Sequence, residues 1–161
     1  MHTGLSKKIS IDEIALLKNI EHAIFPPLPR SFAALMEMYE VNYMQLRLLC
    51  GDIKNLKGCY LAAPESRVPL RLEVLEQSSH TSVLLLTHDF SEDEDPRPDL
   101  QVRVYHDSQQ ANVISCRCRF IGEQAMIKKS YDDETQLLCH WRANRFLFKW
   151  AKYLKRQGYQ F

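Results

Sequence analysis

Hydrophobic positions along the chain recur with two different spacings, which separate helical from extended segments. Between residues 31 and 51 the apolar side chains return every three or four positions, which predicts one buried helical face. The residues on this face are Leu35, Met38, Tyr39, Leu46 and Leu49, and Asn42 lies among them. Ser31 can cap the first turn of this helix, and Gly51 can adopt the left-handed conformation that follows a last turn.

Another helix is predicted before it, over residues 11–24. Ser10 and Glu13 match the capping box with which many helices begin. Three prolines between residues 26 and 29 end this helix, because proline lacks a backbone N–H donor and restricts the residue before it.

The middle of the chain alternates apolar and polar residues, which is typical of half-buried strands. The alternation is strict over residues 70–74, and residues 83–88 form a more continuous apolar strand. Residues 91–99 contain four consecutive acidic side chains and then two prolines. We interpret this segment as a solvated loop, since like charges repel and proline interrupts a strand ladder.

The segments on either side of residues 108–110 are predicted to pair as a β-hairpin. In the predicted register Val102 lies opposite Cys116, and Val104 lies opposite Ile114. Opposed residues of an antiparallel pair share a face, so this pairing gathers the apolar side chains on one side. The other side would carry Arg103, Tyr105, Arg117 and Arg119.

The strongest helical pattern begins near Asp132 and ends before Gly158. Acidic residues at its start and basic residues at its end suit the helix dipole. Its broad apolar side comprises Leu137, Trp141, Ala143, Leu147, Phe148, Trp150, Ala151 and Leu154. The opposite side gathers five cations, hereafter the basic stripe: Arg142, Arg145, Lys149, Lys152 and Arg156.

Together these elements predict an α+β fold. An antiparallel meander sheet of four or five strands is expected, covered on one face by the N-terminal helices and the long C-terminal helix, since an apolar sheet face needs a cover. The chain has 161 residues and a mass of 18.9 kDa, which suits one globule. We divide it into an N-terminal helical extension, residues 1–30, packed against a single α+β domain, residues 31–161.

Composition also bears on the compartment. The first ten residues lack an apolar run of secretory length, and no stretch approaches the ~18 apolar residues that span a bilayer. Five cysteines are present, an odd number in a chain large enough to fold without disulfides, so reduced thiols are expected. We therefore expect a cytoplasmic protein without a membrane partner.

The charges are unevenly distributed. The net charge is only +1, yet residues 51–127 carry a balance of −4 and residues 128–161 a balance of +5. Tyr153 borders the basic stripe, and aromatic side chains beside cations can stack on bases while the cations contact phosphates. Arg103, Arg117 and Arg119 would extend such a site if they adjoin the stripe. The stripe is either a solvated helix face or a site for RNA, DNA or an acidic protein.

His106 and Asp107 are the first candidates for chemistry. Adjacent strand residues point to opposite faces, so we do not expect a direct dyad between them. We expect Asp107 to bond the backbone of its turn and His106 to be a packed or rim histidine. The chain lacks a nucleophile elbow and a glycine-rich phosphate loop.

Three polar residues lie near apolar helix faces: Asn42, His140 and Asn144. Buried polar groups need partners, so we favour internal hydrogen bonds that hold the helices in register over a small polar pocket between them. Cys116, Cys118, Cys139 and His140 lack the spacing of a zinc module. No metal or cofactor is expected.

Three stretches together resemble a known family: Met38-Tyr39-Glu40-Val41-Asn42-Tyr43-Met44-Gln45-Leu46-Arg47, then Val102-Arg103-Val104-Tyr105-His106-Asp107, then Asn144-Arg145-Phe146-Leu147-Phe148-Lys149-Trp150. Their order and content are similar to the YqiB-like proteins of bacteria, domain-of-unknown-function family 1249. The resemblance covers roughly residues 31–158 and implies a bacterial cytoplasmic source. It implies no activity, because the family has none established.

The sequence leads to two hypotheses about function. The first is a non-enzymatic binding or adaptor domain whose basic stripe faces an anionic partner. The alternative is a small-molecule-binding protein or enzyme, with a pocket between the sheet and the helices near Tyr105 and His106.

Overall fold

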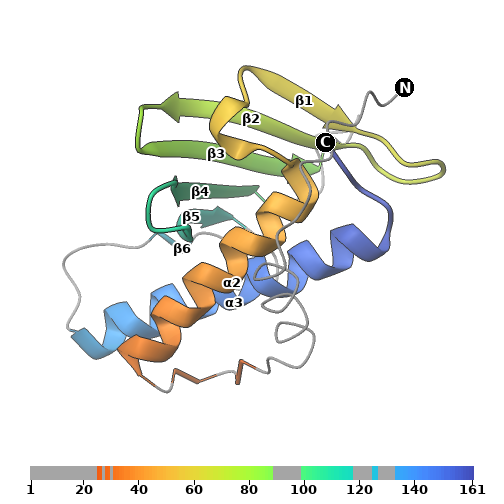
Figure 1. Ribbon diagram of the computed structural model, residues 1–161. Coiled ribbons are helices and arrows are strands. Elements are labelled where there is room, and N and C mark those ends of the chain that lie inside the picture. The colour runs from red at the N-terminus through yellow and green to blue at the C-terminus, as the bar shows by residue number, and fades with distance from the viewer. Residues whose placement is uncertain (1–24, 27, 30, 89–98, 118–124, 127–132) are drawn as a thin grey trace, which may run out of the picture.

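The structure is a computed structural model, which describes residues 25–26, 28–29, 31–88, 99–117, 125–126 and 133–161. In these segments a long helix precedes the strands and another follows them (Figure 1). Each strand pairs antiparallel with the next, so the sheet is a meander in sequence order. The predicted α+β fold is confirmed, and the described sheet has six strands, where four or five were predicted.

The strand bounds are β1 Cys59–Ala62, β2 Leu70–Gln77, β3 Thr81–His88, β4 Asp99–Tyr105, β5 Gln110–Arg117 and β6 Ala125–Met126. The alternation predicted over residues 70–74 is confirmed at Leu70 and Leu72, which are buried, while Arg71 and Glu73 are half-buried on the opposite face. The predicted helix over residues 11–24 and the acidic loop up to residue 98 lie outside the described residues.

Helix α2, Phe32–Cys50, begins and ends as predicted. The Ser31 side chain accepts a hydrogen bond from the Ala34 N–H at 3.1 Å. Gly51 has φ +72°, and its N–H donates to the Arg47 carbonyl at 2.8 Å, which closes the last turn. A short 3-10 helix, η1 Ile53–Asn55, then leads into the sheet. The predicted apolar face of α2 is buried, and Asn42 with it.

The predicted register of the β4–β5 hairpin is wrong. Val104 pairs with Ala111, and Val102 pairs with Val113. Strand β4 ends at Tyr105 and β5 already begins at Gln110, after a turn whose last residue has a positive φ. The chain therefore returns earlier than the predicted alignment assumed.

An irregularity in the same hairpin contributes to the difference between the predicted and the observed register. The register shifts between Gln101 and Val102, so that Gln101 pairs with Ser115 and Ile114 is the extra residue. A bulge of this kind changes which residues of a strand face the core. The apolar residues of β5 follow two alternations that are offset by one residue. One unbroken register can place only one of these two sets on the core face.

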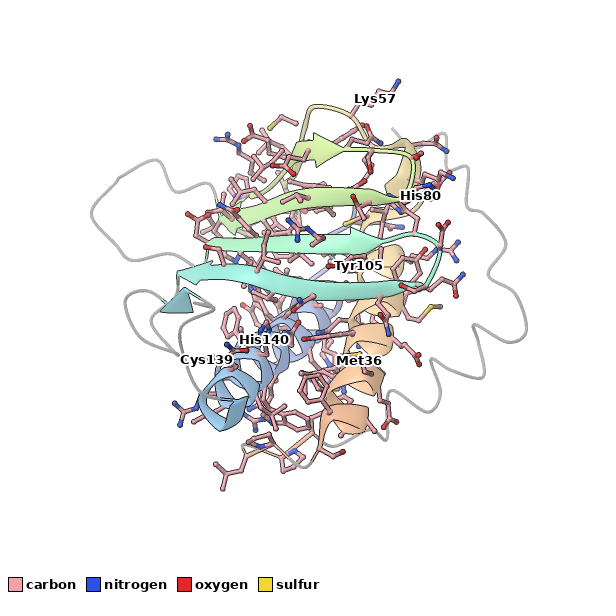
Figure 2. The ribbon with its side chains drawn as sticks, turned by 90° about the vertical axis from the view of Figure 1, so that its left-hand side faces the viewer. Met36, Lys57, His80, Tyr105, Cys139 and His140 are labelled. Carbon is pink, nitrogen blue, oxygen red and sulfur yellow. The ribbon has the colours of Figure 1, made fainter. Side chains whose placement is uncertain are left out.

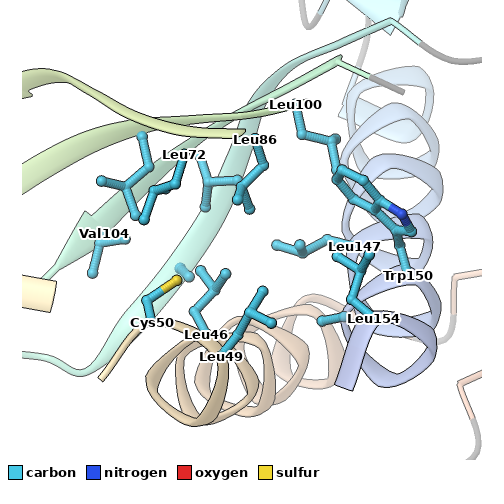
Figure 3. Packing of buried hydrophobic residues seen from close by; sticks show 14 of the residues in the cluster. Leu46, Leu49, Cys50, Leu72, Leu86, Leu100, Val104, Leu147, Trp150 and Leu154 are labelled. Atoms are coloured by element: carbon cyan, nitrogen blue, oxygen red, sulfur yellow. The ribbon is translucent and has the colours of Figure 1, made fainter. Parts of the chain in front are cut away.

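Helix α3, Asp133–Arg156, packs with α2 on the inner face of the sheet, where both helices contact β5. Figure 3 shows side chains of α2, α3 and the sheet meeting in one apolar cluster, with Leu46, Leu86 and Leu147 among them. The predicted apolar side of α3 is confirmed, because its members from Trp141 to Leu154 are buried and Leu137 is half-buried. Among the described helices, none is long and apolar enough to cross a membrane.

Candidate anion-binding surface

The basic stripe follows from the spacing of cations along α3. Steps of three and four residues keep side chains on one face of a helix, and the apolar residues between them are drawn into the core. Arg142, Lys149 and Arg156 are exposed, as predicted. With a rise of 1.5 Å per residue, these three span about 21 Å along the helix. Lys155 is also exposed beside them.

Two members of the stripe are engaged within the protein. The Nε of Arg145 donates to the Phe25 carbonyl at 2.9 Å, and the side chain is half-buried. The Nζ of Lys152 lies 5.2 Å from the centre of the Phe148 ring, a cation–π contact. Arg145 and Lys152 are therefore less exposed than the other three members of the stripe.

The segment that engages Arg145 lies just before α2. The indole Nε1 of Trp141 donates to the Pro26 carbonyl at 2.7 Å. The Phe25 ring meets the rings of Trp141 and Phe148 edge-on, with centroids 6.1 Å and 5.0 Å apart. Residues 25–26 are thus held along α3 beside the stripe. A buried indole N–H requires an acceptor, but the amino-acid sequence does not show which carbonyl supplies it.

The exposed cations of the stripe make no ion pair with the carboxylates that the structure describes. Among the residues that the structure describes, neither Arg142, Lys149 nor Arg156 makes an ion pair, whereas Arg71 and Glu73 pair at 2.6 Å. Cations that no carboxylate neutralises keep their full field toward solvent and attract anions at long range.

Among the three sheet arginines, Arg103 does not extend this surface. Arg103 lies between Val102 and Val104, which are buried under the helices, so it belongs to the opposite face of the sheet. Arg117 is paired with Asp99 in the backbone register, but its side chain lies outside the described part, as does Arg119. The described residues thus separate Arg103 from the basic stripe.

Asn144 is the centre of a buried polar network on the inner side of α3. Its Oδ1 accepts from the Val113 N–H at 2.9 Å, and its Nδ2 donates to the His140 carbonyl at 2.8 Å and to Asn112 Oδ1 at 3.1 Å. The Asn42 side chain donates to the Asn144 carbonyl at 3.1 Å. The favoured interpretation is confirmed for Asn144 and for the Asn42 Nδ2, which link α2, α3 and β5, whereas Asn42 Oδ1 is buried without a hydrogen-bond partner among the described residues.

His140 contributes its backbone to this network rather than its ring. The imidazole is half-buried, and burial lowers its pKa. Its Nδ1 is buried without a hydrogen-bond partner among the described residues. The expected internal hydrogen bond of the ring is therefore not found at this nitrogen.

The turns at one end of the sheet hold the other candidate residues. Asp107 Oδ2 lies 2.7 Å from His80 Nδ1, so in place of the predicted bond to its own turn Asp107 shares a hydrogen bond with the β2–β3 turn. His106 Nε2 lies 2.9 Å from Ser82 Oγ, and burial, with Lys54 nearby, lowers the pKa of His106. His106 and Asp107 form no dyad, as expected.

This cluster lacks the arrangement of a hydrolytic site. Ser82 is only 1% exposed, so its hydroxyl is closed to a substrate.

Figure 2 shows His80 and Tyr105 along the sheet, and His140 on α3. Tyr105 lies near Tyr39, whose pKa is raised to about 12 by burial and by the Tyr105 charge. Within the described ranges, no hydrogen bond joins His106 or Asp107 to Asn42, His140 or Asn144.

The three cysteines whose side chains the structure describes do not gather at a common site. Cys50 is buried, Cys139 is half-buried and Cys59 is exposed, all as free thiols. Burial raises the pKa of Cys50 to about 12. No three potential ligands come together among the described side chains, and those of Cys116 and Cys118 lie outside them.

Sequence reasoning missed Gln45. The residue is 2% exposed in α2, and both polar atoms of its amide are buried without a hydrogen-bond partner in the described structure. It is three residues after Asn42 and so lies at the border of the predicted apolar face. Its helical position could have signalled burial, but the missing partner is visible only in three dimensions.

Fold and site define a single-sheet α+β domain that carries an exposed cationic helix face. The family of proteins of unknown function DUF1249 matches residues 45–160. Because the match covers more than half of the chain, the protein belongs to this family, as the resemblance in three stretches implied. No curated protein and no solved structure gives a significant match.

Proposed function

We propose that this member of the DUF1249 family is a non-enzymatic binding or adaptor domain of the bacterial cytoplasm, and that the basic stripe of α3 binds an anionic partner. One observation carries the proposal: Arg142, Lys149 and Arg156 are exposed on one helix face, without a carboxylate partner among the described residues. RNA, DNA or an acidic protein would supply the complementary charge.

The rigidity of α3 supports a binding role. Each of the three exposed cations lies seven positions after the one before it, which corresponds to about 10 Å along the axis. The apolar side of the helix is anchored in the core, so the backbone positions of these charges are fixed in a row before binding, and only side-chain freedom is lost.

The plain alternative is a solvated helix face without a partner. Exposed cations contribute little to stability, so they are tolerated on any soluble surface. The alternatives differ in salt dependence, because contacts with phosphates release counterions and binding must weaken as salt rises.

The test is a titration of the full chain with a fluorescent 12-nucleotide oligonucleotide at increasing salt. Each phosphate contact should contribute a slope of about −0.7 to log K against log salt for a single strand. Three to five contacts would therefore give a slope of roughly −2 to −4.

A charge-reversed variant, Arg142→Glu with Lys149→Glu, should abolish this binding. The matched control is Lys57→Glu, an exposed lysine at the β1 end of the molecule, away from α3 (Figure 2). Equal behaviour of wild type and the double variant, or no binding of any polyanion at low salt, would refute the proposal.

A further inference from the structure

One large aromatic side chain on α3 is left in solvent. Tyr153 is 50% exposed, whereas Trp141, Phe148 and Trp150 on the same helix are buried. In the described residues the side chain of Tyr153 makes no hydrogen bond, ring stacking or cation–π contact. Its ring is thus accessible to a ligand.

Tyr153 also lies among cations that make no ion pair with the residues that the structure describes. Lys149 lies four residues before it and Arg156 three residues after it, and such positions are neighbours on a helix surface. An aromatic ring flanked by two unpaired cations is the combination that binds single strands, where bases stack on the ring and phosphates meet the charges.

The half-buried Arg145 adds a pre-oriented group. Only its Nε is used by the Phe25 carbonyl, and the terminal nitrogens have no partner among the described residues. A guanidinium fixed through one nitrogen can present its terminal nitrogens to a phosphate oxygen with little further ordering.

We infer that the partner of the basic stripe is a single-stranded nucleic acid, with a base stacked on Tyr153 and the adjoining phosphates bound by Lys149 and Arg156. This inference rests on the proposed function and narrows it. A duplex is less suitable because its bases are stacked on one another and cannot cover the ring, whereas the bases and phosphates of a single strand use the ring and the cations together.

The experiment compares polyanionic probes on the full chain by fluorescence anisotropy. They are a 12-nucleotide oligo(U), an oligo(dT) of equal length, an abasic strand, a 12-base-pair duplex, inorganic polyphosphate and a polyglutamate peptide. We expect oligo(U) or oligo(dT) to bind about tenfold more tightly than the abasic strand and the duplex, since base–aromatic stacking is lost in both. Comparison of the two single strands distinguishes RNA from DNA.

Two substitutions separate stacking from charge. Tyr153→Ala should weaken oligo(U) binding about tenfold without changing polyphosphate binding, whereas Tyr153→Phe should retain the affinity within about twofold. Because Tyr153 is half exposed, circular dichroism and thermal unfolding should confirm that both variants remain folded.

Each other result overturns the inference. If Tyr153→Ala binds oligo(U) like wild type, or if the abasic strand binds equally well, the stripe recognises charge alone and only the proposed function stands. Tighter binding of polyglutamate than of any strand assigns the stripe to an acidic protein. If no probe binds, the proposed function fails as well.

Discussion

Polar side chains on the two sides of helix α3 differ in burial and in whether they have hydrogen-bond or ion-pair partners. On the inner side, Asn144 is fully buried, and its amide makes three hydrogen bonds that tie α3 to β5 and to its own preceding turn. On the outer side, Lys149 and Arg156 are exposed and make no ion pair in the described structure. Burial makes a missing partner costly, while water serves as the partner of an exposed group.

The comparison indicates where function can reside. A residue whose polar atoms are all used inside the protein has no capacity left for a ligand, which describes Asn144. A residue that retains all its donors in solvent can change partners at little cost. Arg145 lies at the boundary, with one nitrogen used internally and its terminal nitrogens free of partners in the described residues.

The largest expected effect is the loss of the inner network. Asn144→Ala leaves the buried Val113 N–H without an acceptor and opens a small cavity, so we expect the free energy of unfolding to fall by about 3 kcal/mol. Urea denaturation measures it. The control Asn112→Ala removes a half-buried acceptor and should cost about 1 kcal/mol. A loss below 1 kcal/mol for Asn144→Ala would contradict the structural role.

Gln45 provides a sharper test, because it is buried like Asn144 but its amide has no partner in the described residues. Gln45→Met keeps a similar shape and removes an unsatisfied amide, so it should raise the free energy of unfolding by about 1 kcal/mol. The exposed Gln77 donates to the Lys54 carbonyl, and Gln77→Met should bring no gain. Destabilisation by Gln45→Met would instead mean that the amide binds a partner.

Acidification should lower the stability of the fold through three histidines and leave the charges of the basic stripe unchanged. Burial is the main cause that lowers the pKa of His88, His106 and His140. Between the lowered folded values and the ordinary value of 6.5, the unfolded chain binds more protons than the folded one. Stability should therefore be complete above pH 6.5 and fall as the pH drops below it, while the arginines and lysines of the stripe stay charged.

Urea denaturation across this pH range measures the effect. His140→Gln should flatten part of the pH dependence, since one of the three groups is removed. A stability that rises on acidification would show that these histidines gain, rather than lose, favourable contacts when protonated.

The smallest stability effect is expected on the outer side. Lys149→Ala should change the free energy of unfolding by no more than about 0.5 kcal/mol, because the side chain is exposed and has no ion-pair partner among the described residues. Differential scanning calorimetry at low and high salt measures it. A loss above 1 kcal/mol would mean that Lys149 is a structural cation, and the contrast between the two sides would fail.

Local patterns were sufficient for the elements and for much of the core. Ser31 and Gly51 bound helix α2 as predicted, and the apolar side of α3 was identified residue by residue, because helix caps and periodicity depend on neighbours within a few positions. Asn42 and Asn144 were recognised as internal groups for the same reason. The three exposed members of the basic stripe also follow from periodicity alone.

Contacts between distant segments were not predictable in this way. The β4–β5 register depended on an early turn and a bulge, which two competing apolar phases concealed. The partner of Asp107 is His80, and the partner of Arg145 is the backbone of Phe25. The sequence by itself determined where the long helices α2 and α3 and the strands β2 to β5 form, and which faces of these helices are apolar, since these depend on short-range periodicity. Only the tertiary structure decided which polar groups meet, because packing selects one partner among many that local chemistry permits.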